Sequence, residues 1–166
     1  MSKQDFPLLQ DLTSDSDMWI YFTQDLSIPS EFKRWAMGHF LEERLQFTVL
    51  DKSSKKIAGA TAFGSFSARD QRLEIGWSWL GKAFQGTGIN QEMKKVMLDY
   101  CFKELHLKRV EIKTDVLNTP ARKALLKLGA VEEGVLRSHT QMTRERRRDT
   151  IYYSFIEGEW PAQSGF

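Results

Sequence analysis

Apolar and polar residues alternate along several short stretches of this chain, and the alternation predicts β-strands. Residues 71–80, QRLEIGWSWL, alternate throughout, which places two sets of side chains on opposite faces of one strand. The apolar set is Leu73, Ile75, Trp77 and Trp79, and the other set is Glu74, Gly76 and Ser78. The turn signal DKSSKK, residues 51–56, lies between two apolar stretches and predicts a hairpin that precedes the strand at 71–80. The predicted strands are 45–51, 57–66, 71–80, 109–115, 131–139 and 150–158.

Helical spacing separates these strands. Residues 15–44 predict two helical pieces, of which Pro29 ends the first and Ser30 caps the second. Residues 90–105 carry apolar side chains at helical spacing and predict a long amphipathic helix. That apolar face holds Met93, Val96, Met97, Tyr100, Cys101 and Leu105.

A short helix follows the strand at 109–115. Its sequence, NTPARKALLKLG, suggests Thr119 as the N-cap, Pro120 at the first helical position and Gly129 after the last turn. The order of elements predicts an α+β fold, a mixed sheet with helices packed on it. No repeat or linker divides the chain, so we expect one domain over residues 1–166.

Composition narrows the class of protein only slightly. The 166 residues are 41% apolar and 28% charged, typical of a soluble globular domain, and a net charge of +2 argues against nucleic acid as a partner. Cys101 is the single cysteine and most resembles a small buried hydrophobe. The three histidines have no metal-ligand spacing, so no metal is expected. The absence of a signal peptide or spanning segment indicates a cytoplasmic protein with no membrane partner.

Residues 83–92, AFQGTGINQE, contain the strongest local motif. Gly86 and Gly88 stand directly before the long helix, where unpaired backbone N–H groups and a partial positive charge favour an anion. A P-loop is excluded because Thr87 occupies the position of its essential lysine. A dinucleotide fingerprint needs a third glycine where this chain has Gln91.

Six motifs in order around this loop resemble the GNAT superfamily of N-acetyltransferases, and among its branches the ribosomal-protein N-terminal acetyltransferases of the RimJ/RimL type. The resemblance covers roughly residues 15–160. It implies a central, mostly antiparallel mixed sheet of about six strands with helices on both faces, and acetyl-CoA in the splay between the central strands. The motifs are LEIGWSWL, FQGTGINQE, the Tyr100–Phe102 region with LKRVEIKTD, NTPARKALLKLGA, EEGVLR and RDTIYYSFIEGEW.

The resemblance also implies the residues that bind the coenzyme. The glycine loop is expected to hold the pyrophosphate through the amides of Gly86, Thr87, Gly88, Ile89 and Asn90, with Gln85 adding hydrogen bonds. The strand backbone around Trp77 and Trp79 is expected to bind the pantetheine arm. Asn118 is expected to hydrogen-bond that arm or to fix the splay between the strands.

The implied chemistry is direct attack of a primary amine on the acetyl thioester through a tetrahedral oxyanion. The amide of Trp77 or Ser78 is the candidate donor to that oxyanion. Glu74 is the candidate base, because the alternation places it on the same face as Gly76 and Ser78, near the reacting carbonyl. A solvated strand glutamate paired with Arg72 or a neighbouring residue is the competing interpretation of Glu74. The acceptor is either a protein N-terminus or a small-molecule amine.

Three departures from the family pattern bear on function. Asn90 stands where the loop usually ends in Gly or Ala, and we expect it to cap the helix. Ala121 and Leu125 occupy the positions of the two known hydroxyl donors to the departing thiolate. Their absence leaves open a catalytically weak or inactive acyl-CoA-binding sensor of the same fold.

The third departure is the missing first strand of the family. Unless FPLLQD, residues 6–11, replaces that strand, one sheet edge is left uncovered, and such an edge favours a homodimer. The run RERRR at Arg144–Arg148 has several interpretations. It is a solvated hairpin loop, a site for nucleic acid, or a group of side chains that recognise an acidic part of the acceptor.

Overall fold

The computed structural model describes residues 1–38, 44–143 and 145–160. One sheet runs through it in the order β1-β2-β3-β4-β6-β5. Strands β3 and β4 are parallel, and every other neighbouring pair is antiparallel. This arrangement confirms the predicted mixed, mostly antiparallel sheet. The strands are β1 (Leu45–Leu50), β2 (Ile57–Ser67), β3 (Arg72–Leu80), β4 (Arg109–Asp115), β5 (Val131–Gln141) and β6 (Arg147–Ile156).

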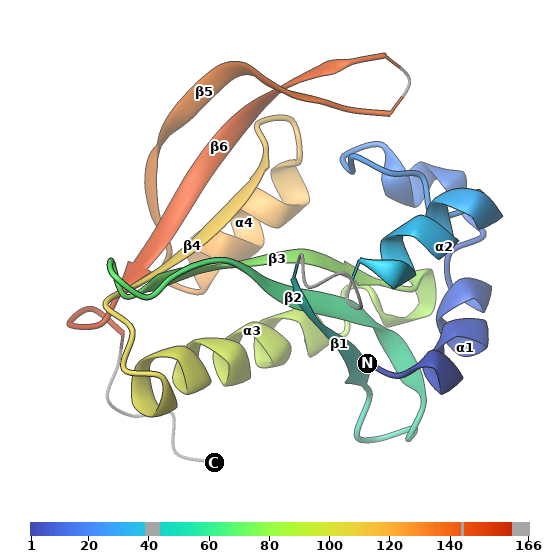
Figure 1. Cartoon of the computed structure of the whole chain (residues 1–166), viewed down its shortest axis with the longest axis horizontal. Helices are drawn as coiled ribbons and strands as arrows, with labels where there is room; N and C mark the ends of the chain where they lie inside the picture. Colours follow the sequence, from blue (N-terminus) through green and yellow to red (C-terminus); the bar gives the residue numbers. More distant parts are fainter. Residues whose placement is uncertain (39–43, 144, 161–166) are drawn as a thin grey trace.

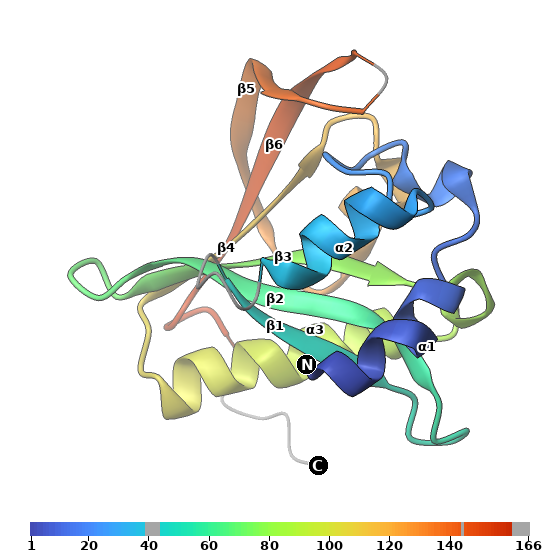
Figure 2. The same cartoon turned by 45° about the vertical axis from the view of Figure 1, so that its right-hand side comes forward.

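Helices cover both faces of the sheet, as predicted (Figures 1 and 2). On one face α3 and α4 pack against Ile75 and Val110 of the central strands. On the other face α1 and α2 pack around Trp79. The helices are α1 (Phe6–Asp11), α2 (Pro29–Met37), α3 (Ile89–Asp99), which continues as a π-helical turn over Tyr100–Glu104, and α4 (Thr119–Lys127).

The N-terminal helices differ from the prediction. Only a 3₁₀ turn, Ser16–Trp19, forms in the first predicted piece. Helix α2 begins at Pro29 with Ile28 as its N-cap, so Ser30 lies inside the helix. Proline suits the first helical position because its φ is already helical and its missing N–H would have no partner there.

The segment FPLLQD forms helix α1 and does not replace a strand. Strand β1 is therefore the edge of the described sheet. The N-terminus nevertheless lies beside that strand, because the Met1 amine donates to the Gln46 carbonyl at 3.3 Å and Thr48 donates to Asp5 at 2.8 Å. The homodimer stays a prediction.

Helix α4 begins one residue earlier than predicted. Its N-cap is Asn118, whose Oδ1 accepts from the Ala121 amide at 3.2 Å, and Thr119 is the first helical residue. A capping side chain must itself lie outside the helix, and Asn serves this purpose as well as Thr. Gly129 follows the helix with φ of +95°, which confirms its predicted place.

Strand β3 contains a β-bulge that the sequence did not reveal. Trp79 pairs with Ala60 and Gly76 pairs with Ala62, so both Trp77 and Ser78 lie opposite Thr61. Trp77 adopts φ of +51°, the left-handed conformation that places the extra residue in the strand. One extra residue exchanges the two faces of the strand for every position that follows.

The predicted alternation is therefore wrong beyond Gly76. Leu73 and Ile75 face α3 and α4, whereas Trp79 lies on the opposite face, where its ring centroid is 5.5 Å from that of Trp19 and 5.6 Å from that of Trp35. These aromatic rings bind the N-terminal helices to the sheet. The bulge thus separates a core beneath α3 from a core beneath α2.

The two central strands separate soon after they pair. Strand β3 pairs with β4 only from Arg72 to Glu74, opposite Arg109 to Glu111. Beyond these residues β3 stays with β2, and β4 stays paired with β6 along its full length. The sheet therefore opens between β3 and β4, which is the splay that the family resemblance predicts.

Candidate functional site

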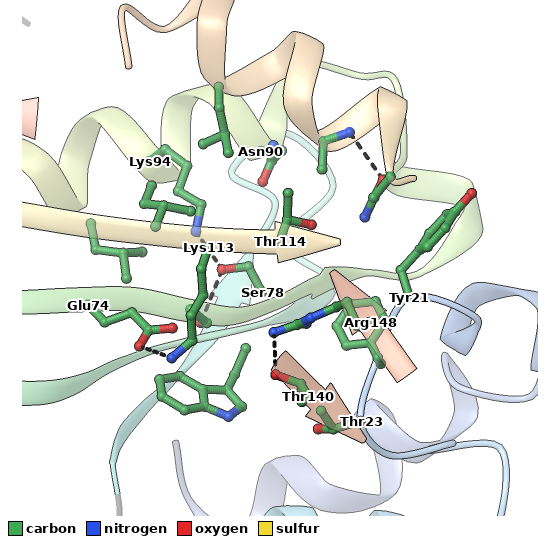
Figure 3. A pocket seen from close by; sticks show the side chains of 18 residues that line it. Tyr21, Thr23, Glu74, Ser78, Asn90, Lys94, Lys113, Thr114, Thr140 and Arg148 are labelled. Atoms are coloured by element: carbon green, nitrogen blue, oxygen red, sulfur yellow. Dashed lines mark hydrogen bonds and ion pairs between the residues drawn. The ribbon is translucent and has the colours of Figure 1, made fainter. Parts of the chain in front are cut away.

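A cavity of about 350 Å³ occupies the opening between β3 and β4. Its walls come from β3 beyond Glu74, from β4 beyond Glu111, and from the first turns of α3 and α4. The segment 21–23 and the ends of β5 and β6 close one side of it (Figure 3). The cavity thus gathers side chains that lie far apart in the sequence.

Glu74 lies in this cavity and is 4% exposed. Its Oε2 accepts from Lys113 Nζ at 2.8 Å and from Ser65 Oγ at 3.1 Å, so Glu74 is paired with a residue of β4 and not with Arg72, and it is not solvated. Its Oε1 accepts from none of the described residues. A Cβ at Gly76 would lie 2.9 Å from Oε1, so glycine at this position keeps that oxygen accessible. One carboxylate oxygen is held and the other faces the cavity.

Ser78 does not share a face with Glu74, because the bulge turns Ser78 toward α3. Its Oγ accepts from Lys94 Nζ at 2.5 Å and shares a hydrogen bond with Thr61 Oγ1 at 2.7 Å. Lys94 is 6% exposed, and burial lowers its pKa to about 7 even though the nearby charge of Glu74 acts in the opposite direction. A buried amine that exchanges protons near neutral pH therefore lies on the floor of the cavity.

Trp77 is fixed by contacts on the other side of the sheet. A Cβ at Gly64 would lie 2.5 Å from the Trp77 ring, so the ring rests directly on a glycine. The Arg44 guanidinium lies 5.4 Å from the ring centroid. Neither Trp77 nor Ser78 has a register partner in β2, and β4 has already separated at this point. On the side of β4, the bulge backbone therefore borders the cavity and has no neighbouring strand.

The glycine loop before α3 has the features of an anion site. Gly86 and Gly88 adopt φ of +74° and +92°, and a Cβ on either would meet nothing within 4 Å. Among the described residues, none accepts a hydrogen bond from the amides of residues 86–90. Five adjacent amides at the start of an 11-residue helix fit a pyrophosphate. The loop is therefore compatible with coenzyme A.

Two side chains hold the shape of this loop from within. Gln85 Nε2 donates to the Leu80 carbonyl at 3.0 Å, and Thr87 Oγ1 donates to the Phe84 carbonyl at 2.7 Å. Asn90 does not cap α3 as predicted, because Gly88 is the N-cap and no side-chain cap is formed. With φ of +92° the backbone itself ends the loop, and the Asn90 side chain lines the cavity (Figure 3).

Helix α4 contributes one amide and two apolar side chains to the cavity. Asn118 uses its Oδ1 for the cap, and its Nδ2 donates to none of the described residues. Ala121 and Leu125 also line the cavity, so the two positions that lack hydroxyl groups face the site directly. Neither of these two positions offers a hydroxyl group that could protonate a leaving group.

The described arginines of the run at 144–148 each have a different position, and Arg144 lies outside the described residues. Arg146 pairs with Asp115, which is fully buried, and also donates to the Ile20 carbonyl at 3.2 Å. Arg147 bonds Ser138 on β5. Arg148 lines the cavity. The run is thus engaged within the fold.

Other kinds of chemistry find little support in the described part of the chain. Cys101 is completely buried, and burial raises the pKa of its thiol to about 12, which confirms its structural role. Residues 1–38, 44–143 and 145–160 contain no group of three or more His, Cys, Asp or Glu side chains placed to hold a metal ion. Across the same residues, no helix has both the length and the apolar character to cross a membrane.

Comparison with known proteins identifies the class. The family model described as "Acetyltransferase (GNAT) domain" matches residues 1–131, and the chain belongs to this family. It is similar to the "Uncharacterized N-acetyltransferase p20" of Bacillus licheniformis, with 29% identity over 90% of this chain and 76% of that protein. It is also similar to the "Putative ribosomal N-acetyltransferase YdaF" of Bacillus subtilis, with 24% identity over 87% of this chain and 80% of that protein.

The fold is shared as well. A GCN5-related N-acetyltransferase from Brucella melitensis superimposes with a TM-score of 0.89 and 26% identity, over 98% of this chain and 75% of that one. The predicted resemblance to GNAT proteins, with relatives of the ribosomal type among them, is confirmed. Sequence reasoning found the glycine loop, Glu74 and Asn118, and it included Arg148 as one member of the arginine run, but it missed Lys94 and Lys113.

Proposed function

We propose that this protein is an N-acetyltransferase that transfers the acetyl group of acetyl-CoA to a primary amine. One observation carries the proposal: the cavity between β3 and β4 has Glu74 on its wall and reaches Asn90, at the end of the row of amides that precedes α3. An elongated thioester with a phosphate end fits this arrangement. The membership of this chain in the GNAT family supports the same conclusion.

Residues along the opening are assigned to the coenzyme. The amides of residues 86–90 bind the pyrophosphate. The backbone of Trp77 binds the pantetheine arm, which occupies the position beside β3 that β4 has left. Trp79 contributes only backbone groups, because its indole packs between Trp19 and Trp35. Asn118 offers its Nδ2 to the arm. When bound, the coenzyme supplies the reactive thioester.

Glu74 acts as the base for the acceptor. Its Oε1 takes a proton from the ammonium group, which leaves a neutral amine to attack the thioester carbonyl. Lys113 and Ser65 hold Oε2 and so fix the direction of Oε1. The amides of Trp77 and Ser78 donate to the tetrahedral oxyanion, a contribution of about 10²–10³ in rate for one fixed donor.

The departing thiolate receives its proton from Lys94 in this mechanism. Ala121 and Leu125 provide no donor, whereas Lys94 Nζ is buried in the cavity at 2.5 Å from Ser78 Oγ. An ammonium group with a pKa of about 7 gives up a proton readily at neutral pH and regains it from solvent. The proton passes from Lys94 to Ser78 and from Ser78 to the sulfur.

A binding domain without catalysis is the second candidate, and the apolar side chains of Ala121 and Leu125 favour it. Such a sensor would bind acetyl-CoA and would release no coenzyme A with any amine. In that case Glu74→Gln would change neither binding nor background hydrolysis. A transferase would show coenzyme A release that requires an amine and is lost in Glu74→Gln.

The coenzyme is tested first by thermal unfolding with acetyl-CoA, ATP or NAD. At a hundred times its dissociation constant, acetyl-CoA adds about 2.7 kcal/mol and raises the Tm by roughly 5 °C. Gly88→Asp places a carboxylate among the amides and should abolish this shift. Gly129→Asp is the matched control, because Gly129 has nearly the same φ, +95° against +92°, and lies after α4. An equal shift with ATP, or none with acetyl-CoA, would refute the assignment.

A further inference from the structure

Arg148 is a charged group of the cavity that forms no ion pair with any of the described residues. It is 8% exposed, and its Nε and Nη2 donate only to the hydroxyls of Thr150 and Thr140, at 2.9 and 3.4 Å. Its Nη1 donates to none of the described residues.

Burial lowers the pKa of Arg148, although the nearby charges of Asp115 and Glu74 act in the opposite direction. Both of those carboxylates are already paired, Asp115 with Arg146 and Glu74 with Lys113. A guanidinium keeps its proton at neutral pH, so an anion would stabilise it.

The remaining charges of the cavity do not supply that anion. Among the described lining residues, Glu74 is the one carboxylate, and Lys113 already holds it at 2.8 Å. This pair is neutral overall, so the charge of Arg148 is left in excess. Lys94 adds further positive charge when it is protonated. A purely cationic acceptor, such as a polyamine, would meet net positive charge in this cavity.

The position of Arg148 separates it from the proposed phosphate site. Figure 3 shows its guanidinium pointing into the cavity beside Thr140, on the side closed by Tyr21 and Thr23. The free amides of the glycine loop precede α3, which joins the cavity through Asn90 and Lys94. An anion bound by Arg148 would therefore belong to the acceptor and not to the pyrophosphate.

We infer that the acceptor is an amine that carries a carboxylate, as in an amino acid, with Arg148 binding the carboxylate while Glu74 takes the proton of the amine. This inference rests on the proposed function and narrows its substrate class. Bidentate contact with a carboxylate suits a planar guanidinium better than it suits a lysine. Hydroxyls of Thr140 and Thr150 hold the guanidinium in place. Polyamines, aminoglycosides and peptide N-termini without a nearby acidic group are poor acceptors on this basis.

The test compares the twenty amino acids with their amides, and with spermidine, in coenzyme A release. We expect kcat/KM for the best amino acid to exceed that of its amide roughly 10- to 100-fold. The lower amine pKa of the amides biases the assay against this result, which makes a positive outcome stronger. Arg148→Gln should bring the ratio close to one, and Arg148→Lys should retain part of it. Arg147→Gln is the matched control, because Arg147 bonds Ser138 outside the cavity and should keep the full ratio.

A second measurement does not need turnover. N-acetyl amino acids and their amides are added to the protein with coenzyme A, and the Tm is recorded for the wild type and Arg148→Gln. A shift with a free carboxylate alone, lost in the variant, supports the inference. The inference is overturned if the protein acetylates amides or spermidine as well as it acetylates amino acids. It is also overturned if the protein neither binds nor acetylates any compound with a free carboxylate. An unchanged acetyl-CoA shift in Arg148→Gln separates the acceptor from coenzyme phosphate, and loss of that shift overturns the assignment to the acceptor. If the wild type itself shows no acetyl-CoA shift, the proposed function fails instead.

Discussion

Lys94 Nζ donates a hydrogen bond to Ser78 Oγ across 2.5 Å, and this contact joins α3 to the bulge of β3. It exists because the bulge turns Ser78 away from the face of Glu74 and toward the helix. A buried lysine is thereby placed beside the proposed reaction centre. Its titration gives the first prediction.

Lys94 should make stability depend on pH in a defined window. The unfolded chain keeps the Lys94 proton up to pH 10.5, whereas the folded protein loses it near pH 7. Between these values the folded state binds fewer protons, so its stability rises with pH by up to about 1.4 kcal/mol per pH unit. Below pH 7 this contribution is constant. Urea unfolding of the wild type and Lys94→Met at pH 6.5, 7.5 and 8.5 should show that the wild type gains stability relative to the variant as the pH rises.

The neighbouring Lys95 is exposed and provides the control for that experiment. Lys95→Met should run parallel to the wild type across the same pH range. A constant difference between the wild type and Lys94→Met would contradict a lowered pKa for Lys94. It would also remove Lys94 from the proposed mechanism.

Glu74→Gln should lower kcat by about 10²–10⁴-fold, because the amide cannot accept the proton of the acceptor. Acetyl-CoA should still raise the Tm, since Glu74 is not among the residues assigned to the coenzyme. Coenzyme A release and thermal unfolding measure the two effects separately. Glu104→Gln, at an exposed position of the π-helical turn, should change neither. Wild-type kcat in Glu74→Gln would require another base.

Arg146→Met should destabilise the protein by about 2 kcal/mol. It leaves the carboxylate of Asp115, which is fully buried, without its cationic partner, although Asp115 keeps the Leu117 amide at 2.9 Å. Urea unfolding gives the difference directly. Arg147→Gln removes the adjacent, exposed arginine and should cost less than half as much. Equal losses of stability in the two variants would mean that the buried ion pair stabilises the fold no more than the contacts of an exposed arginine do.

Cys101 should not react with a disulfide reagent in the folded protein. Its thiol is completely buried and has a pKa near 12, so the reactive thiolate is absent at neutral pH. One thiol should appear after unfolding in urea. Because the same reagent detects released coenzyme A, a silent Cys101 also keeps that assay free of background. Rapid labelling without denaturant would contradict the burial.

The sequence predicts the strands well because they alternate or are bounded by clear turn signals. The pattern of 109–115 coincides with β4 from its first residue to its last. The bulge escapes prediction because Trp77 and Trp79 keep an apparently regular period, and only tertiary packing reveals the extra residue. The exchange of faces after Gly76 follows from that one residue.

The apolar face predicted for α3 is right in part. Met97 and Cys101 are buried, whereas Val96 and Tyr100 fit the helical period but are 49% and 48% exposed. Lys94 also belongs to the buried face, together with Leu98 and Cys101. A signal was present, since Lys94 precedes these two buried residues by one and two helical turns. A lysine on an apolar stripe is easily taken for solvent-exposed. The sequence identifies Arg148 only as one member of the run Arg144–Arg148 and does not distinguish it from its neighbours.

The three residue pairs that join β3 to β4 give the molecule a mechanical weak point. The sheet consists of two three-stranded halves, β1–β3 and β4–β6, which meet along one short seam and diverge from it (Figure 1). A bound coenzyme arm would hydrogen-bond both halves and act as a removable strand. The acetyl donor would then also fix the distance between Glu74 and Arg148, which lie on different halves of the sheet. If the arm closes the opening between the halves in this way, the coenzyme would bind before the acceptor, because the acceptor site would reach its final dimensions only afterwards.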